Sequence, residues 1–211
     1  MSINKKCIIR LSRYKNALHN FQKLGFVKVF SDNLGDAVGV TAAQVRKDFS
    51  LFGITGHRRG GYIIDELVEK LNNILGTNEM QNVIVVGAGN LGTALLNYKR
   101  FEKDGIKIIA AFDIDPSKVK KTTDVPVLSL EELSSFIKKN NVKVGIIAVP
   151  EIAAQQVFDI MESAGIKGFL NFTPVRFRVQ NDDVFINNVN LAIELENVIY
   201  YATANLETTT A

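Results

Sequence analysis

The chain has 211 residues, 46% of them hydrophobic, and a formal net charge of +3. It contains no run of 18 apolar residues and begins without the long apolar stretch of a signal peptide, so we expect a cytoplasmic protein without a membrane span. A single cysteine, Cys7, excludes an internal disulfide and cannot form a metal cluster alone, so we expect no metal site.

The charge is unevenly distributed. Residues 1–62 carry eleven Lys and Arg and three Asp, a net charge of +8, whereas the remaining residues have a net charge of −5. A basic excess on a small domain is typical of a protein that binds a polyanion. The alternative is that the two halves neutralise each other across an interface.

Two helices are predicted before residue 40. Residues 5–25 carry apolar side chains at helical spacing and end at a glycine, which is a common helix terminator. Residues 31–39 predict a short second helix with Ser31 as its N-cap.

A third helix follows, in which Thr41 and Gln44 fit a capping box. The glycine-rich stretch at 53–64 predicts a hairpin, and residues 65–75 predict a fourth helix. This order indicates a winged helix-turn-helix domain over residues 1–78.

The third helix is the candidate recognition helix. Val45, Phe49 and Phe52 are expected to face inward. The other side then offers hydrogen-bond donors for guanine and phosphate, and a side-chain amide for adenine. If that helix enters a major groove, the arginines of "GHRRGGY" would lie beside a minor groove. The residues expected to contact DNA are Ala43, Gln44, Arg46, Lys47, Ser50, His57, Arg58 and Arg59. Of these, Arg46 and Gln44 are the better candidates for base readout.

From residue 80 onward, apolar strands alternate with amphipathic helices, which predicts a parallel sheet covered on both faces. The expected strands cover residues 82–89, 106–115, 142–150 and 166–175, and the expected helices cover 91–103, 129–140 and 153–165. The fold class is therefore α/β, with a Rossmann-type domain over residues 80–189.

The sequence "VVGAGNLG" carries a glycine fingerprint after the first of these strands. It places Gly87, Gly89 and Gly92 at GxGxxG spacing, and Asp113 follows 21 residues after the last glycine, at the end of the next strand. In a strand–turn–helix context this pattern predicts dinucleotide binding, with the pyrophosphate at the helix N-terminus that begins near Asn90 and Leu91. A carboxylate at position 113 favours NAD(H) over NADP(H).

The last predicted helix, within residues 190–211, is apolar on nearly all sides. One sheet can cover only one face of such a helix, so we expect it to swap into a partner subunit.

With these motifs the chain resembles the Rex family of redox-sensing transcriptional repressors. The resemblance spans nearly the whole chain and is carried by "RLSRY" (10–14), "VTAAQVRKDFSLFG" (40–53), "RRGGY" (58–62), "VVGAGNLG" (85–92), Tyr98, "IAVP" (147–150) and "GIKGFLNFTPV" (165–175). It implies a homodimer with a domain-swapped C-terminal helix. It also implies binding to a palindromic operator when NAD⁺ predominates, and release when NADH binds.

The resemblance adds further site residues. It implies DNA contacts for Arg10 and Tyr62, and nucleotide contacts for Tyr98, Val149, Pro150 and Thr173, with Tyr98 near the nicotinamide.

The sequence departs from the family pattern at several positions. Arg59 replaces a glycine of the wing pattern, and Thr173 replaces an alanine. An Arg–Asp pair that links the two domains in the family is replaced by Asn16 and Asn190, so we expect a displaced NADH set point.

Two other functions remain open. One is an NAD-dependent oxidoreductase with a basic N-terminal appendage, although His19 and His57 both lie outside the Rossmann segment, where a general acid or base is needed. The other is a nucleotide-binding regulator that acts on a protein partner and uses the helix-turn-helix as a dimer surface.

Overall fold

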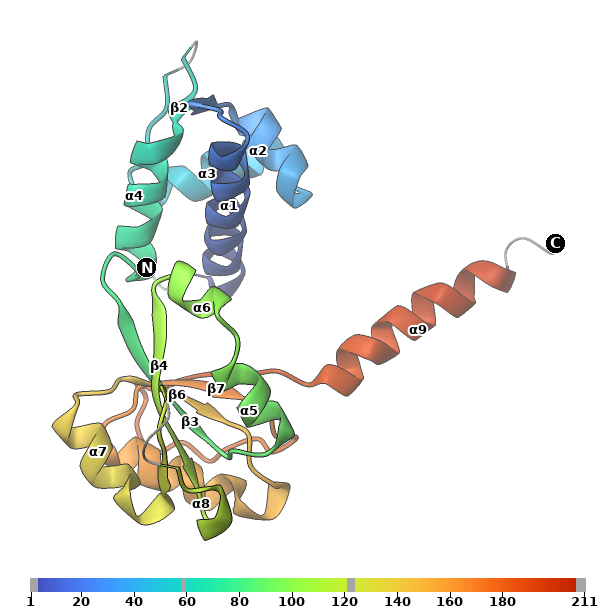
Figure 1. Cartoon of the computed structure of the whole chain (residues 1–211). Coiled ribbons are helices and arrows are strands. Elements are labelled where there is room, and N and C mark those ends of the chain that lie inside the picture. The colour runs from blue at the N-terminus through green and yellow to red at the C-terminus, as the bar shows by residue number, and fades with distance from the viewer. Residues whose placement is uncertain (1–3, 58–59, 121–123, 208–211) are drawn as a thin grey trace. The chain divides into compact units, whose positions relative to one another are not determined.

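The computed structural model describes residues 4–57, 60–120 and 124–207 (Figure 1). The chain forms two compact units, Met1–Gln81 and Asn82–Ala211. Within the described residues, no helix is both long and apolar enough to cross a membrane.

The first unit is helical with a small two-stranded sheet. Its elements are α1 (Lys5–Lys23), β1 (Lys28–Val29), α2 (Ser31–Val38), α3 (Ala42–Ser50), β2 (Tyr62–Ile63) and α4 (Ile64–Leu75). Strands β1 and β2 pair antiparallel. Leu11, Leu34, Val45 and Leu71, one from each helix, are fully buried in a common core.

The start of α2 differs from the prediction. Ser31 is the first helical residue rather than the N-cap, and Phe30 occupies the cap position without a side-chain hydrogen bond. The pairing of Val29 with Tyr62 explains the difference, because it keeps the chain extended up to Phe30 (φ −104°, ψ 160°). The helix therefore begins where no side chain can cap it.

The second unit contains a parallel six-stranded sheet in the order β5-β4-β3-β6-β7-β8. Its strands are β3 (Gln81–Val86), β4 (Ile106–Asp113), β5 (Val127–Ser129), β6 (Val144–Ile147), β7 (Gly168–Asn171) and β8 (Phe185–Asn188). Its helices are α5 (Asn90–Leu96), α6 (Arg100–Lys103), α7 (Leu133–Lys139), α8 (Glu151–Ala164) and α9 (Leu191–Glu207), and short 3₁₀ turns lie at Pro116–Lys118 and Leu130–Glu132.

Helices cover both faces of this sheet. On one face, side chains of α7 and α8 pack against Ile84, Val86 and Phe112. On the other, Leu95, Leu96 and Phe101 pack against the alternate residues of the same strands, such as Val85 and Ala111. The predicted Rossmann-type layering is confirmed.

The sequence-based assignment was wrong at three places in this unit. Strands β5 and β8 were not predicted, because they are three and four residues long and β8 ends in two asparagines. The helix expected over residues 91–103 is divided into α5 and α6. At the division, the Asn97 amide donates to the carbonyl of Thr93 at 2.9 Å and so competes with the helix backbone.

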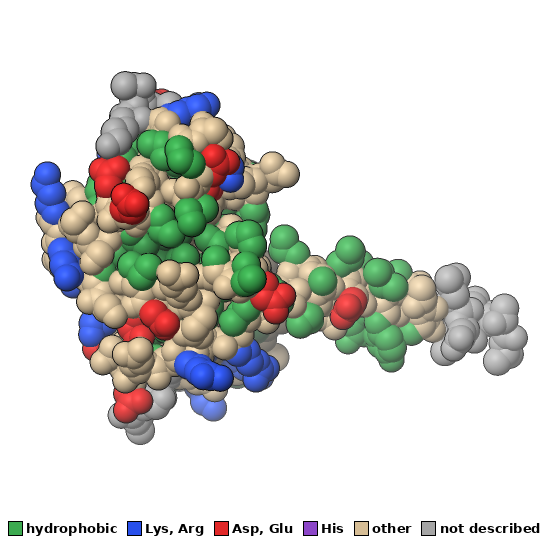
Figure 2. All heavy atoms as spheres, turned by 90° about the horizontal axis from the view of Figure 1, so that it is seen from below, with side chains coloured by type: hydrophobic (Ala, Val, Ile, Leu, Met, Phe, Trp, Pro, Cys, Tyr) green, Lys and Arg blue, Asp and Glu red, His purple; other side chains and the backbone are tan. Residues whose placement is uncertain are grey.

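Helix α9 exposes apolar side chains along its length, as Figure 2 shows in green. They are Leu191, Ile193, Leu195, Val198, Ile199, Tyr200 and Tyr201, and each is more than half exposed. Asn190 caps the helix, with its Oδ1 accepting from the backbone N–H groups of Ala192 and Ile193. An aspartate at this position would offer the same acceptor, so the cap requires no charge at residue 190.

We expect α9 to hold a dimer together. Leu195→Asp combined with Ile199→Asp removes two large apolar contacts and would place charges in the interface, which should weaken dimerisation by about a hundredfold or more. Sedimentation over a range of concentrations measures this. Ser135→Asp with Lys139→Asn, on the exposed side of α7, changes the net charge by the same two units and should leave association unchanged. A fully dimeric α9 variant would contradict a role for the helix in assembly.

Candidate functional site

Helix α3 presents the face expected of a recognition helix. Val45 and Phe49 are fully buried, whereas Ala43, Arg46, Lys47 and Ser50 are exposed on the opposite side. The helix is capped by the Thr41 hydroxyl, which accepts from the backbone N–H of Gln44 at 3.2 Å. Only this half of the predicted capping box is present, because the Gln44 side chain turns to Asp48 instead.

A buried carboxylate, Asp48, lies on the inner side of α3 and receives five donors. Its oxygens accept from Arg10 Nε at 2.6 Å and Nη2 at 2.7 Å, from the Tyr14 hydroxyl at 2.9 Å, and from Gln44 Nε2 at 2.8 Å. The thiol of Cys7 approaches the same carboxylate at 3.5 Å. Asp48 therefore ties α1 to the recognition helix.

This network changes the expectation for Arg10. Its side chain is 21% exposed and is engaged by both oxygens of Asp48, so in the structure it orients α3 rather than pointing freely outward. Sequence reasoning did not single out Asp48. The available signal was an acid in an otherwise basic helix, one turn after Gln44 and opposite the (i, i+4) pair Arg10 and Tyr14.

The electrostatics of the network favour the charged carboxylate. Burial acts to raise the pKa of Asp48, but the hydrogen bonds from Arg10, Tyr14 and Gln44 outweigh it and hold that pKa below its ordinary value. The same pairing raises the pKa of Arg10, chiefly through the hydrogen bond to Asp48. Arg10 and Asp48 therefore remain an ion pair throughout the neutral range.

The wing follows α3. A bridge joins His57 to Gly61, and Tyr62 packs its ring edge-on against Phe49 with centroids 5.2 Å apart. Gly61 has φ +66°, and a side chain there would meet the carbonyl of Val29 at 2.5 Å, so the turn requires glycine. Arg58 and Arg59, which were predicted to contact DNA, lie outside the described residues.

In the second unit, the glycine fingerprint has the geometry that the sequence predicted. A Cβ on Gly87 (φ +101°) would lie 2.3 Å from the carbonyl of Ala148, and one on Gly92 would lie 1.8 Å from the carbonyl of Gly87. Both glycines permit close backbone packing. A Cβ on Gly89 would meet nothing within 4 Å, so the space above it is open.

Backbone donors surround this open space. The first helical hydrogen bond of α5 runs from Thr93 N to Gly89 O at 2.8 Å. The N–H groups of Asn90, Leu91 and Gly92 therefore have no acceptor among the described residues. Free N–H groups at a helix N-terminus form a site for phosphate.

Asp113 ends β4 beside the glycine loop. Its Oδ2 accepts from the backbone N–H of Ala88 at 2.8 Å and from Lys118 Nζ at 3.1 Å, and its Oδ1 accepts from the N–H of Asp115 at 2.9 Å. Burial acts to raise the pKa of this carboxyl, but the three donors outweigh it and hold the pKa below its ordinary value. Asp113 thus anchors the glycine loop, and its predicted contact with a ribose remains a prediction.

Two exposed isoleucines near this edge were missed by sequence reasoning. Ile114 follows β4 and is 81% exposed, and Ile152, in the first turn of α8, is 96% exposed. They lie beyond the carboxyl ends of β4 and β6, on either side of β3, and Val149 and Pro150 occupy the same edge after β6. Single exposed hydrophobic residues are common on protein surfaces, so it is the position at this edge of the sheet that makes them candidates for a ligand contact.

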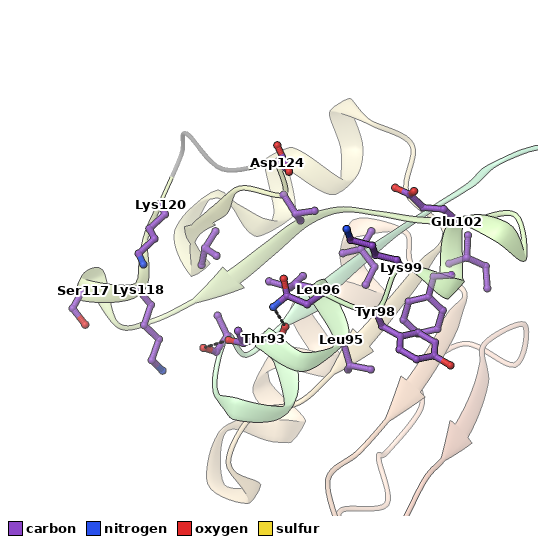
Figure 3. A pocket seen from close by; sticks show the side chains of 17 residues that line it. Thr93, Leu95, Leu96, Tyr98, Lys99, Glu102, Ser117, Lys118, Lys120 and Asp124 are labelled. Atoms are coloured by element: carbon purple, nitrogen blue, oxygen red, sulfur yellow. Dashed lines mark hydrogen bonds between the residues drawn. The ribbon is translucent and has the colours of Figure 1, made fainter.

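A cavity of about 690 Å³ lies on the α5 side of the sheet (Figure 3). Tyr98 and Lys118 line its opposite ends, and Leu95, Leu96 and Ile108 are among its apolar residues. Tyr98 is half exposed and meets Phe101 edge-on. Gly89 and Asp113 do not line it, but Ala88 of the glycine loop and Thr93 of α5 do, so the cavity connects Tyr98 with one side of that loop.

Thr173 is buried in a side-chain network at the end of β7. Its hydroxyl donates to Asn171 Oδ1 at 2.8 Å, and Asn171 Nδ2 donates to Asn188 Oδ1 at 2.8 Å. The network thus connects Thr173 to β8, two residues before the cap of α9. Asn16 lies exposed on α1 in the other unit.

Comparison with known families and proteins gives matches in both units. Residues 2–50 match the family described as "Putative DNA-binding protein N-terminus", and residues 78–175 match the family "CoA binding domain". The redox-sensing transcriptional repressor Rex of Desulforamulus reducens is 44% identical over 197 residues, 93% of each chain. The Rex protein of Carboxydothermus hydrogenoformans is 43% identical over 92% of this chain and 93% of its own.

Solved structures agree with these matches. A Rex-family repressor called RSP superposes with a TM-score of 0.87 at 36% identity, covering 99% of this chain and 98% of its own. RSP in complex with β-NADH gives a TM-score of 0.87 at 37% identity, with the same coverage. RSP in complex with β-NAD⁺ and operator DNA gives 0.88 at 36% identity and full coverage of both chains.

Loss of the Asp48 charge should destabilise the first unit. Asp48→Asn leaves the Arg10 guanidinium without its counterion, which should cost about 3 kcal/mol of unfolding free energy. Hydrogen exchange of α1 and α3, followed by mass spectrometry, isolates this unit from the other. Asp36→Asn, an exposed change of the same charge on α2, should stay within about 0.5 kcal/mol.

The same measurement against pH tests the ion pair. Because the folded-state pKa of Asp48 is depressed, its contribution is fully present above the unfolded-state pKa of about 3.9 and is lost as the pH falls through the folded-state value. The protection of α1 and α3 from hydrogen exchange in the parent should therefore decline below about pH 4. Asp48→Asn should not show this acid-dependent decline. Identical acid profiles would show that Asp48 carries no stabilising charge.

Proposed function

The chain belongs to the Rex family of redox-sensing transcriptional repressors, and we propose that it binds operator DNA through its first unit and releases the DNA when NADH occupies the second. One observation carries the proposal: the outward basic face of α3 and the open space above Gly89 occur in one chain. Neither an ordinary dehydrogenase nor a constitutive repressor needs both.

On the DNA side, the exposed residues of α3 would enter a major groove and the wing would follow the adjacent minor groove. Arg46, Lys47 and Ser50 would contact bases or phosphates, with Gln44 at the edge of the same surface. We assign Arg10 a positioning role through Asp48 instead of the direct contact expected from the sequence. A homodimer would present two such surfaces to a palindromic operator.

On the nucleotide side, the pyrophosphate would lie over Gly89 and accept from the free N–H groups at the start of α5. The adenine would stack between Ile114 and Ile152, and Asp113 would lie near its ribose. Tyr98 and Thr173 would approach the nicotinamide end. RSP has been crystallised with β-NADH and, separately, with β-NAD⁺ and operator DNA, which supports a nucleotide-dependent switch in this chain.

The response to redox state requires unequal binding of NADH to the DNA-bound and free forms, because a ligand shifts an equilibrium only by its differential affinity. We further propose that the protein is cytoplasmic and is not an enzyme. The names of the relatives support the latter, since they are transcriptional repressors.

Titration of NADH into a complex of the dimer with an operator duplex tests the function directly. NADH should release the DNA, whereas NAD⁺ at the same concentration should not. Gly89→Ala should fold normally, since its Cβ meets no atom. The added methyl would occupy the pyrophosphate's place and should raise the NADH needed for release about tenfold or more. Unaltered DNA binding at saturating NADH would refute the proposal, and reduction of a small carbonyl substrate would favour the oxidoreductase.

Cofactor preference should depend on Asp113. Its carboxylate repels a 2′-phosphate, but Lys118 neutralises part of that charge, so we expect NADH to bind about tenfold more tightly than NADPH. Asp113→Asn should narrow this preference in calorimetry, and Asp115→Asn, the same change two residues later, should not. Equal affinity of the parent for both nucleotides would show that Asp113 does not discriminate between them.

A further inference from the structure

A group of exposed apolar side chains lies at one end of the first unit, in and beside the turn between α1 and β1. Leu24 is 72% exposed, Phe26 is 55% exposed and Val27 is 69% exposed. Ile63 of β2, which is 40% exposed, lies opposite Lys28, the residue that follows Val27. We call these four apolar side chains the Leu24 patch. Single exposed apolar residues need no explanation, whereas a contiguous group of them marks an interaction surface.

The local fold accounts for only part of this patch. Phe26 closes α1, because its backbone N–H donates to the carbonyl of Phe21 at 3.0 Å and the two rings meet edge-on with centroids 5.8 Å apart. Together with Gly25 at φ +80°, this is a common way to end a helix. Leu24 and Val27 lie outside the core of the unit. A polar side chain would therefore serve the fold equally well at either position.

The patch lies beside the wing and away from the connection to the second unit. The Gln22 amide donates to Asp65 at 2.7 Å, so the end of α1 lies next to the start of α4. Helix α4 then runs for 12 residues, about 18 Å at the rise of an α-helix, before the chain continues to the second unit. Strand β2, which carries Ile63, follows the wing directly. A molecule bound to the patch would therefore be a neighbour of the bound DNA.

Charges of both signs border the patch. Lys23 and Lys28 are exposed at its α1–β1 side, and Asp65 and Glu66 are exposed in the first turn of α4. These two lysines balance the two carboxylates, although residues 1–62 as a whole have a net charge of +8. Two copies of so basic a unit repel each other, and the repulsion is weakest where the charges balance. Exposed carboxylates beside apolar groups are poor contacts for a phosphate backbone, so the charges favour a second copy over DNA.

We propose that the Leu24 patch binds the same patch of a second repressor dimer on the same DNA, so that neighbouring operators are filled cooperatively. A two-fold axis through the contact would bring the apolar side chains together and place the lysines of each copy opposite the carboxylates of the other. Four side chains bury far less than the roughly 1,200 Å² of a stable interface, so the contact forms only where DNA holds two dimers close together. The inference rests on the proposed DNA-binding function and adds a contact between repressors to it.

Binding of the full-length protein to duplexes with one operator and with two tests this contact, with the operator selected from random sequence and the spacing between two copies varied in single steps. The parent should fill the second operator about tenfold more tightly than a single one, at spacings that recur about every ten base pairs, because both dimers must lie on the same face of the duplex. Leu24→Gln combined with Val27→Gln should abolish this preference, while the affinity for one operator and the melting temperature stay unchanged. Val179→Gln alters an exposed apolar residue of the second unit and should keep the preference.

A charge exchange then tests the two-fold arrangement. Lys28→Glu alone and Glu66→Lys alone should each lose the cooperative preference, because like charges then meet across the axis, and both changes in one chain should recover it. The affinity for one operator, measured alongside, corrects for the effect of each charge on DNA binding.

Three results would overturn the inference while binding to one operator, and its release by NADH, still support the repressor function. They are independent filling of two operators by the parent at every spacing, unchanged cooperativity of the variant with both Leu24→Gln and Val27→Gln, and no recovery in the charge-exchanged variant. If the parent binds no operator at all, the proposed function and this inference both fail.

Discussion

The first unit depends on one ion pair that is largely removed from water. Asp48 has 1% of its side chain exposed and takes five donors from three turns of α1 and one of α3. Such a carboxylate stabilises a fold only when its donors are complete, because a buried charge without partners costs several kcal/mol. The orientation of α3 is therefore fixed relative to α1. This also fixes the direction in which the outward side chains of α3 point. The charges that face solvent can then vary without loss of the scaffold.

In the second unit, the corresponding constraint is close backbone packing at the carboxyl ends of β3 and β6. Gly87 and Gly92 allow the end of β3, the start of α5 and the end of β6 to meet at distances that no side chain could tolerate. Asp113 fixes the loop between them through Ala88 N. Free N–H groups, open space and exposed apolar side chains thus collect at one edge of the sheet, where parallel α/β folds bind ligands.

The features that the sequence predicted well are those set by local spacing. The glycine fingerprint, the acid at the end of the next strand and the inward positions of α3 all follow from short-range rules. The features that it missed depend on partners far along the chain. Asp48 meets Arg10 across 38 residues, and the start of α2 is set by the pairing of β1 with a strand more than 30 residues away. The spacing of apolar residues in a helix or strand does not indicate such contacts. Strands β5 and β8 are too short to show a recognisable alternation of apolar and polar residues.

The position of Cys7 has a consequence for how this protein can respond to oxidation. The thiol is 2% exposed, and burial, followed by the neighbouring anionic Asp48, raises its pKa. Oxidants such as peroxides and disulfides react with the thiolate, which is disfavoured here both by desolvation and by like charge. The sulfur is therefore shielded from sulfenic acid formation and from mixed disulfides. Information about the redox state of the cell would therefore reach the DNA-binding unit through the bound dinucleotide and not through oxidation of Cys7.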